Sequence, residues 1–357
     1  MTAGSERNHA TPLVELKAVS KHFVRSRDLA SRFARLARRD RGAVIVRAVE
    51  EVDLAIGEGE SVGLVGESGC GKSTLGRLAA GLLPPSAGER LWRGENCAAQ
   101  GRDSARQLKT QMVFDDPDAA LNPLLRVLDL VGEAPVAHRI IASRQQIEYV
   151  GLQLNRVGVD PTLMRRFAHQ FSRGQRTRIG IARALAVKPE FLVCDEPVAA
   201  LDVSTQAQIL NLITDLRAAL DLTYLFISRD LRVVRHMSDR VAIMYLGRVV
   251  ESGPTAEIFA SPNHPYTQAL LAAAGSLEPK KRAFVPVKGE IPSPAAPPAG
   301  CAFHPRCPVR LEICSVQTPA ATEVGPGRSA RCWLATPGQP QENEDDTVGG
   351  ARNNGPH

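Results

Sequence analysis

The chain alternates between short apolar runs and longer stretches in which apolar residues recur three or four positions apart. The short runs occupy 61–65, 191–194, 224–228 and 241–245. They are typical of strands that are buried on both faces of a sheet. Residues 205–220 carry helical spacing, with Ser204 as the expected N-cap. This alternation predicts an α/β domain with a largely parallel sheet.

The same pattern divides the chain into regions. Residues 13–24 alternate in part and predict a strand, whereas 125–186 lack strand-like runs and carry helical spacing. From about residue 261 onward, proline and glycine become more frequent and the periodicity fades. We expect disordered tails at 1–12 and 336–357, because these segments hold too few apolar residues to build a core.

Composition excludes two broad classes of protein. The 357 residues are 43% hydrophobic and 23% charged, a balance that permits a buried core and excludes disorder of the whole chain. No run of about 18 apolar residues occurs, which excludes a transmembrane helix. Residues 1–10 are polar, so we expect no secretory signal and a cytosolic protein, unless a partner holds it at a membrane.

The net charge is 44 − 38 = +6, which weakly indicates contact with nucleic acid or anionic lipid. Arginines are concentrated at 25–41, where seven of them stand against two aspartates. We expect a solvated, charged insertion there, and contact with lipid headgroups or a partner is the alternative.

Residues 66–73 match the phosphate-binding pattern G-x-x-x-x-G-K-[ST], between a predicted strand and a predicted helix at 73–80. Its glycines let successive backbone N–H groups face a β-phosphate, and the helix N-terminus adds partial positive charge. We expect Lys72 to contact the β- and γ-phosphate oxygens and Ser73 to offer its hydroxyl to Mg²⁺. The expected nucleotide-binding residues of this loop are Gly66, Glu67, Ser68, Gly69, Cys70, Gly71, Lys72, Ser73 and Thr74.

An acidic pair follows the predicted strand at 191–194. Asp195 would lie at the C-terminal edge of the sheet beside the phosphates, where it can help to hold Mg²⁺. Glu196 is then placed to polarise a water for in-line attack on the γ-phosphorus. An apolar run with two acids is weak by itself, but together with the phosphate loop it indicates ATP hydrolysis.

A third motif makes the interpretation specific. Residues 171–175 are Phe-Ser-Arg-Gly-Gln and precede a helical pattern at 176–185. This stretch resembles the Leu-Ser-Gly-Gly-Gln signature of the ATP-binding subunits of ABC transporters. The order of phosphate loop, signature, acidic strand and the Ala-Leu-Asp stretch at 200–202 also agrees with that family. The resemblance covers about residues 13–260.

The resemblance implies a P-loop ABC ATPase domain: a mostly parallel sheet, an antiparallel β part and a helical signature subdomain at about 115–186. In that family two domains pair head to tail, and each ATP lies between one phosphate loop and the other domain's signature. Residues Ser172, Arg173, Gly174 and Gln175 would therefore serve the partner's nucleotide. Asp202 would belong to the D-loop. Phe23 would stack on adenine, or else be a core residue at a strand end.

Further stretches resemble the ATP-binding subunits of oligopeptide and dipeptide importers. They are Phe-Asp-Asp-Pro at 114–117, Leu-Asn-Pro at 121–123, His-Pro-Tyr-Thr at 264–267, Gly-Glu-Ile-Pro-Ser-Pro at 289–294 and Cys-Ala-Phe-His-Pro-Arg-Cys-Pro at 301–308. This resemblance implies a small, irregular C-terminal extension at 261–335. Related importers carry nickel or sugars, so the transported substrate stays open.

The resemblance also implies cofactors and partners. ATP and Mg²⁺ would be bound, with Ser73, Asp195 and Asp115 around the metal. The expected partners are a second, different ATPase subunit, two membrane permease subunits and, indirectly, an extracytoplasmic substrate-binding protein. We therefore expect a peripheral protein on the cytoplasmic face of the cell membrane, with no nucleic-acid partner.

Three positions depart from the family pattern. Asp115 stands where the family has the Q-loop glutamine, and an ionised carboxylate only accepts hydrogen bonds. Arg173 replaces the first signature glycine. Arg229 replaces the switch histidine, and it is a permanent cation with a rigid fork. We predict that this chain binds ATP well but hydrolyses it poorly, with Glu196, Asp115 and Arg229 as the residues concerned.

Two alternatives differ in class. One is a regulatory nucleotide-binding pseudo-ATPase, which the substitutions at Asp115 and Arg229 favour. The other is a soluble ABC ATPase that acts on nucleic acid or ribosomes, which fits the basic charge slightly. A third alternative keeps the importer function: the substitutions are tolerated, and both ATP sites of the head-to-tail pair hydrolyse ATP.

The C-terminal extension carries four cysteines, at Cys301, Cys307, Cys314 and Cys332. Four thiolates suit a 4Fe–4S cluster or tetrahedral Zn²⁺, and the absence of a C-x2-C pair counts against a zinc ribbon. The family resemblance favours the cluster, and unligated thiols are the third possibility. Elsewhere, Cys70 is either a small filler of the phosphate loop or a thiol whose pKa the helix N-terminus lowers.

Overall fold

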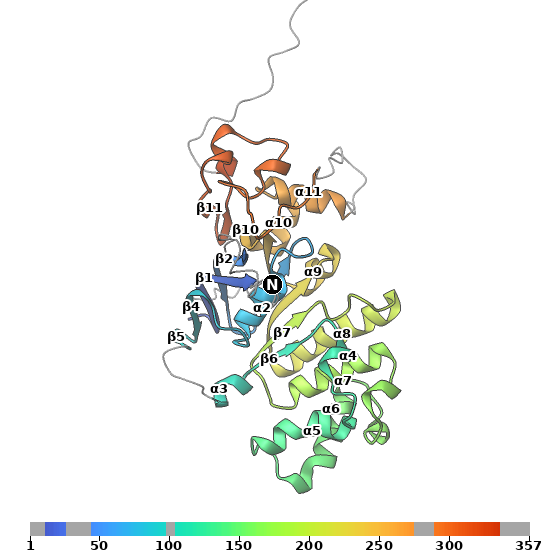
Figure 1. Cartoon of the computed structure of the whole chain (residues 1–357). Helices are drawn as coiled ribbons and strands as arrows, with labels where there is room; N and C mark the ends of the chain where they lie inside the picture. The colour runs from blue at the N-terminus through green and yellow to red at the C-terminus, as the bar shows by residue number, and fades with distance from the viewer. Residues whose placement is uncertain (1–10, 26–43, 98–103, 275–288, 336–357) are drawn as a thin grey trace, which may run out of the picture.

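The computed structural model describes residues 11–25, 44–97, 104–274 and 289–335. The expected tails and the arginine-rich insertion lie outside the described residues, apart from Thr11, Pro12 and Arg25. From the N-terminal strands (blue), the chain passes through a green helical part at the bottom of Figure 1. It ends in an orange and red part at the top.

The described strands form two sheets. The smaller sheet is antiparallel, in the order β2-β1-β4-β5. Its strands are β1 Val14–Arg25, β2 Val44–Ile56, β4 Ala87–Trp92 and β5 Glu95–Asn96. The sequence pattern predicts only the first of these, because the others mix polar and apolar positions on a half-exposed sheet.

The larger sheet has eight strands in the order β11-β12-β10-β9-β3-β8-β7-β6. The five strands from β9 to β6 run parallel, whereas β10, β12 and β11 are antiparallel to their neighbours. Their bounds are β3 Ser61–Val65, β6 Thr110–Val113, β7 Phe191–Asp195, β8 Thr223–Ser228, β9 Arg240–Tyr245, β10 Arg248–Pro254, β11 Thr322–Gly325 and β12 Arg328–Ala330. The four predicted apolar strands are therefore confirmed as neighbours in one parallel core.

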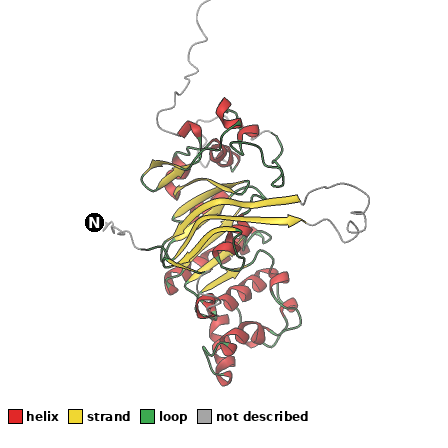
Figure 2. Ribbon diagram, turned by 60° about the vertical axis from the view of Figure 1, so that its left-hand side comes forward, coloured by secondary structure: helices red, strands yellow, loops and turns green. Residues whose placement is uncertain are grey.

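Helices cover this sheet, and most of them lie in the lower half of Figure 2. Their bounds are α2 Lys72–Ala79, α3 Ser104–Leu108, α4 Pro117–Ala120, α5 Val127–Ala137, α6 Gln146–Arg156, α7 Arg173–Leu185, α8 Val203–Leu220, α9 Leu231–Met237, α10 Thr255–Ala260 and α11 Pro265–Ala273. Helices α4 to α7 form the helical region predicted at about 115–186. None of the helices in the described part of the chain has the length and apolar character that crossing a bilayer requires.

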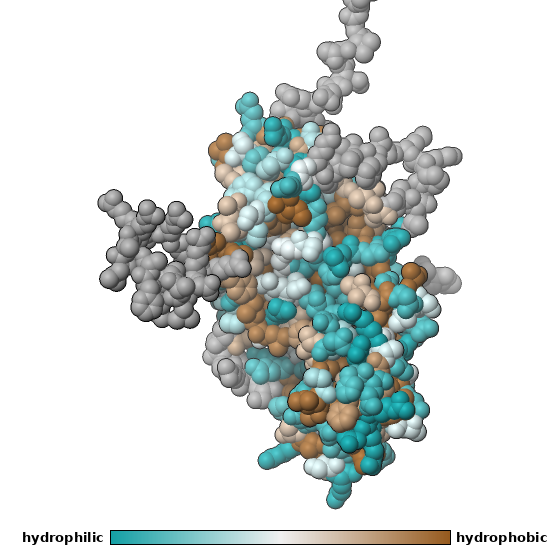
Figure 3. All heavy atoms as spheres, turned by 45° about the vertical axis from the view of Figure 1, so that its right-hand side comes forward, coloured by the Kyte–Doolittle hydropathy of each residue, from teal (hydrophilic) through white to brown (hydrophobic). Residues whose placement is uncertain are grey.

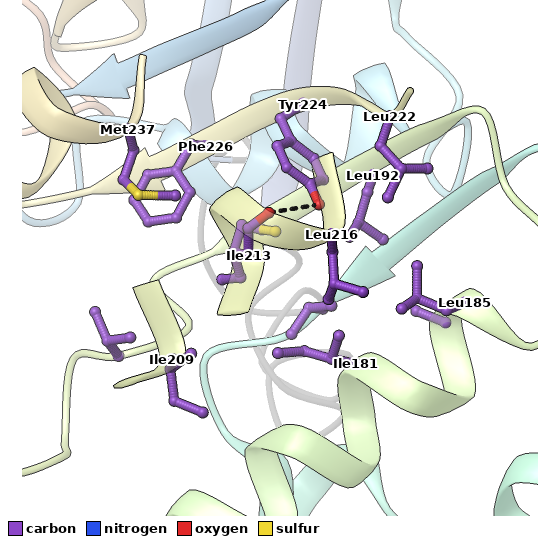
Figure 4. Packing of buried hydrophobic residues seen from close by; sticks show 14 of the residues in the cluster. Ile181, Leu185, Leu192, Ile209, Ile213, Leu216, Leu222, Tyr224, Phe226 and Met237 are labelled. Carbon is purple, nitrogen blue, oxygen red and sulfur yellow. Dashed lines mark hydrogen bonds between the residues drawn. The ribbon is translucent and has the colours of Figure 1, made fainter. Parts of the chain in front are cut away.

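Two apolar cores hold these layers together. One joins both sheets to α2, and the other joins the opposite face of the larger sheet to the helical region and the extension. Figure 4 shows the second core, where Tyr224 donates from its hydroxyl to the carbonyl oxygen of Ile213 in α8 at 3.2 Å. A buried hydroxyl without a partner would cost free energy, so this bond lets tyrosine occupy a fully buried position.

The C-terminal extension is folded onto the ATPase domain. It contains the short helical turns His304–Arg306, Glu312–Ser315 and Trp333–Ala335 together with β11 and β12. The fading periodicity gave no indication of α11 or of these two added strands. On the face seen in Figure 3, hydrophilic residues dominate the helical part at the bottom, with small apolar spots between them.

Candidate functional site

The phosphate loop connects the end of β3 to the start of α2, as the sequence predicts. Gly71 adopts a left-handed backbone with φ 108°. A Cβ there would lie 2.1 Å from the carbonyl oxygen of Ala48, and a Cβ at Gly66 would lie 2.1 Å from that of Met244. No side chain fits at either position, so both glycines are required by close backbone approach.

Lys72 folds back across this loop. Its ammonium group donates to the carbonyl oxygens of Gly66 at 2.8 Å and Glu67 at 3.0 Å. Since an ammonium has three donors, one remains for a phosphate oxygen. Cys70 is buried, and this burial raises the pKa of its thiol, so the expectation of a lowered pKa was wrong.

Asp195 and Ser73 meet at the C-terminal edge of the sheet. The Ser73 hydroxyl donates to Asp195 Oδ1 at 3.1 Å, while Asp195 Oδ2 is buried without a hydrogen-bond partner in the described structure. Burial raises the pKa of Asp195 to about 6, and the negative charges of Asp115 and Glu196 add to this rise. A hydroxyl beside a carboxylate that has an unsatisfied oxygen matches the ligand chemistry of Mg²⁺. Ser73 and Asp195 therefore fit the metal, whereas the contribution of Asp115 stays a prediction.

Glu196 and Arg229 form a direct ion pair. Arg229 Nε donates to Glu196 Oε2 at 2.8 Å, across the ends of β7 and β8. The Arg229 side chain is 55% exposed and that of Glu196 is 17% exposed. Glu196 has a positive φ of 44°, a strained conformation that is often found at functional sites. The arginine at the position of the switch histidine thus holds the carboxylate expected to polarise water.

An open cleft of about 550 Å³ lies beside this pair. Its walls include Glu196, Arg229 and Gln206 from the ATPase core, and Leu270 and Ala274 from the region of α11. Open space therefore lies next to Glu196, and residues of the C-terminal extension form part of the wall of this cleft.

The signature residues lie at the start of α7. Ser172 is the N-cap, and its hydroxyl accepts from the Gln175 N–H, while Gln175 Oε1 accepts from the Ser172 N–H at 3.0 Å. This capping box fixes the helix end, and Arg173 is its first residue. Gly174 is packed so closely that a Cβ would lie 2.6 Å from Thr205 Cγ2.

Asp202, not Ser204, caps α8. Its carboxylate accepts from the Thr205 N–H at 2.9 Å and from the Thr205 hydroxyl at 2.7 Å. The expectation for Ser204 was wrong because the helix begins at Val203, two residues earlier than the apolar spacing indicates. Thr205 is thus hydrogen-bonded to Asp202 and packed against Gly174, so it connects the predicted D-loop to the predicted signature.

Phe23 is 42% exposed near the end of β1, with Lys21 Nζ 5.6 Å from the centre of its ring. This exposure makes the core alternative wrong. The adenine-stacking role stays a prediction.

Glu67 faces the C-terminal extension. Its N–H donates to the Tyr266 hydroxyl at 3.0 Å, and its carboxylate binds Arg306. Sequence reasoning assigned Tyr266 and Arg306 no role. The only signal was that both lie in stretches shared with the peptide-importer group.

The four C-terminal cysteines line one small cavity together with His264 and Phe303. None of the four forms a disulfide, and burial raises the pKa of Cys301, Cys332 and Cys307, that of Cys307 to about 11. The space between them is about 10 Å³. Within the described ranges, no group of three or more histidine, cysteine or acidic side chains is arranged to hold a metal ion.

Comparisons with known proteins agree with this geometry. Residues 49–199 match the ABC transporter family, and residues 250–314 match the oligopeptide/dipeptide transporter C-terminal region. The chain is 44% identical to the oligopeptide transport ATP-binding protein AppF of Bacillus subtilis over 341 residues, 94% of this chain and 99% of the relative. It is 46% identical to a probable peptide ABC transporter ATP-binding protein, y4tS of Sinorhizobium fredii, over 82% of this chain and 84% of the relative.

Solved structures share the fold. A dimeric, post-hydrolysis structure of the ATP-binding cassette MJ0796 with ADP and phosphate has a TM-score of 0.56 at 26% identity. It covers 68% of this chain and 98% of that cassette. The chain therefore belongs to the ABC transporter family and, within it, to the ATP-binding subunits that carry the oligopeptide/dipeptide transporter C-terminal region.

Proposed function

We propose that this chain is the ATP-binding, energy-coupling subunit of a peptide importer. The observation that carries the proposal is the 44% identity to an oligopeptide transport ATP-binding protein along nearly the whole of both chains. The match of residues 250–314 supports the same class. The basic charge favours nucleic acid only weakly, so we do not adopt that alternative.

The chain's own residues suit nucleotide binding in distinct ways. The phosphate-loop N–H groups and the free donor of Lys72 would bind the phosphates. Ser73, Asp195 and Asp115 would hold Mg²⁺, which when bound neutralises charge on the β- and γ-phosphate oxygens. Ser172 and the Gly174 N–H would face a nucleotide on a partner ATPase. ATP would join the two domains and hydrolysis would release them, which drives the permease between its states.

We propose further that this chain's own site hydrolyses ATP poorly. Arg229 Nε donates to Glu196 Oε2 at 2.8 Å, so a water that Glu196 polarises must reach its other oxygen or displace the arginine. A neutral histidine would offer an acceptor nitrogen as well as a donor, whereas arginine only donates. Most turnover would then occur at the phosphate loop of a second, different ATPase subunit, which uses Ser172 and Gly174 of this chain.

The test is Arg229→His in the assembled transporter, compared with Glu196→Gln. If the pair restrains Glu196, Arg229→His raises ATP hydrolysis at this site about tenfold, a partial recovery of the roughly 10²–10⁴-fold that general base catalysis usually contributes. Glu196→Gln in this chain alone leaves most transport-coupled hydrolysis, whereas the same change in the partner ATPase abolishes it. Loss of all hydrolysis on Glu196→Gln in this chain would show that its site carries turnover.

The proposed assembly places the chain at the cytoplasmic face of the membrane, on two permease subunits. An extracytoplasmic binding protein would deliver the peptide. Purification from detergent-solubilised membranes tests this: two integral membrane proteins and a second ATPase are expected with the tagged chain. Recovery of the chain alone, or with ribosomes, would contradict the importer assignment.

We also propose that Cys301, Cys307, Cys314 and Cys332 bind a 4Fe–4S cluster. Their thiols all line one cavity, and four thiolates are the usual ligand set of such a cluster. The thiols must move apart, since the cavity holds about one water. Anaerobic purification tests the proposal: a brown protein with absorbance in the visible range supports it, and colourless protein with bound zinc contradicts it.

A further inference from the structure

An ion pair joins the C-terminal extension to the phosphate loop. Arg306 uses both terminal nitrogens, which lie 2.7 Å and 2.9 Å from the two carboxylate oxygens of Glu67. The two residues are separated by 239 positions in the chain. The Arg306 side chain is only 6% exposed. This is a bidentate, largely buried pair, the strongest common form of a charge-assisted hydrogen bond.

The charge of Glu67 is at an unfavourable position for an anion-binding loop. It is the second residue of a loop whose N–H groups and Lys72 are arranged to bind triphosphate. A free carboxylate there would repel the phosphates, because like charges interact strongly where water is partly excluded. Arg306 supplies the compensating charge from outside the loop.

Aromatic packing fixes the position of this compensating charge. The rings of Tyr245, Tyr266 and Phe303 lie 4.7–5.4 Å apart, and the Arg306 guanidinium lies 5.8 Å from the centre of the Tyr245 ring. The Tyr266 hydroxyl accepts from the Glu67 N–H at 3.0 Å. Side chain and backbone of Glu67 are therefore both held by residues from beyond the phosphate loop.

We propose that Arg306 is a positioning residue for nucleotide binding: it neutralises Glu67 and holds the phosphate loop in its binding form. The inference rests on the proposed ATP binding by this chain and deepens it, because it gives the extension a part in nucleotide affinity. Arg306 itself does not touch the nucleotide. Its effect passes through the Glu67 carboxylate and the loop backbone.

The test is a charge cycle in the full chain, with a fluorescent ATP analogue as the probe. Arg306→Gln is expected to weaken binding about tenfold, since it exposes the phosphates to an unpaired negative charge. The double variant Glu67→Gln, Arg306→Gln removes both charges and is expected to restore most of the affinity. Arg310→Gln is the matched control: it removes the same charge from an exposed position of the extension and is expected to leave affinity unchanged.

A second readout separates charge from structure. The loss of affinity on Arg306→Gln, measured in the same full chain, should be larger for ATP than for ADP, because the γ-phosphate adds negative charge that the unpaired Glu67 carboxylate repels. Arg306→Lys keeps the charge without the fork, so an intermediate affinity is expected even if Arg306→Gln unfolds. Thermal unfolding of each variant checks folding.

Two results would overturn the inference: unchanged affinity in folded Arg306→Gln, or a double variant as weak as the single one, which would indicate a purely structural role. Failure of the wild-type chain to bind ATP would instead overturn the proposed function, and this inference with it.

Discussion

Two regions of this chain are built differently. The phosphate-loop side comprises residues 66–73 with Asp195, Glu196 and Arg229, and the signature side comprises residues 172–175 with Asp202 and Thr205. The phosphate-loop side assembles residues from β3, β7, β8 and the C-terminal extension, and it carries Asp115 and Arg229 in place of expected groups. The signature side is local: Ser172 and Gln175 cap each other, and Asp202 fixes Thr205 against Gly174. Apart from Arg173 it keeps the family pattern.

In the proposed pairing with a second ATPase, this chain would therefore supply an almost unaltered signature and an altered phosphate-loop side. A signature that depends on two helix caps tolerates changes elsewhere in the protein. The phosphate-loop side depends on four separate segments, so one replaced side chain can form a new contact with a residue of another segment. The ion pair between Arg229 and Glu196 is an example. The following variants test this contrast, starting with the largest expected effect.

Lys72→Ala and Ser172→Ala should separate the two sides. Lys72→Ala removes a charge-assisted contact to phosphate, so nucleotide affinity of the isolated chain is expected to fall about a hundredfold. Ser172→Ala is expected to retain that affinity but to lower hydrolysis in the assembled transporter, with about 1 kcal/mol of stability lost with the cap. Titration with a fluorescent ATP analogue and ATPase assays measure both. Equal loss of affinity in the two variants would contradict the division.

Gly174→Ala should damage the signature side alone. The added methyl would lie 2.6 Å from Thr205 Cγ2, so α7 or α8 must shift, at a cost of about 1–3 kcal/mol. Thermal unfolding and hydrolysis by the transporter measure the effect. Adding Thr205→Ser removes the clashing methyl but keeps the hydroxyl bonded to Asp202, and it should recover most of the loss. No recovery would mean that the close contact is not the cause.

Mild acid should weaken the extension that supports the phosphate loop. Burial lowers the pKa of His264 to about 3, below its unfolded value of 6.5. The unfolded chain therefore binds a proton that the folded chain does not, and stability is lost as the pH falls below 6.5. The loss is about 1.4 kcal/mol by pH 5.5.

The control is His264→Asn, which keeps an acceptor for the Tyr266 N–H but cannot titrate in this range. Its unfolding free energy should depend less on pH between 7 and about 5 than that of the wild type. Identical pH profiles for the two proteins would assign the acid sensitivity to other groups.

The parallel core and the phosphate loop could be predicted because their determinants are contiguous. Residues 61–73 combine a short strand, all of whose residues are buried, with glycines at fixed spacing. Both signals can be recognised within a few neighbouring residues of the sequence. The cap of α8 was predicted two residues too late, at Ser204 instead of Asp202, because several polar residues near this helix end can serve as the N-cap. The antiparallel strands escaped prediction since β2 and β4 are only partly buried and lack a clear apolar alternation.

The ion pairs at the site could not be predicted from pattern alone. Arg229 and Glu196 were each identified, but their direct contact depends on the order of β7 and β8 in the sheet. Glu67 and Arg306 meet only because the extension folds back over β9 and β10. No periodicity or spacing encodes such a meeting, which depends on the tertiary structure.

The pairing of β12 with β10 has a consequence for how the chain can be shortened. Glu251 and Ser252 in β10 pair with Ala330 and Ser329 in β12, so the extension caps one border of the main sheet. A truncation after Ala260, at the end of α10, would leave the N–H and C=O groups of β10 open to pairing with other chains. Such a shortened protein is prone to aggregate, and its insolubility would reflect an uncovered strand and not a failure of the ATPase core to fold.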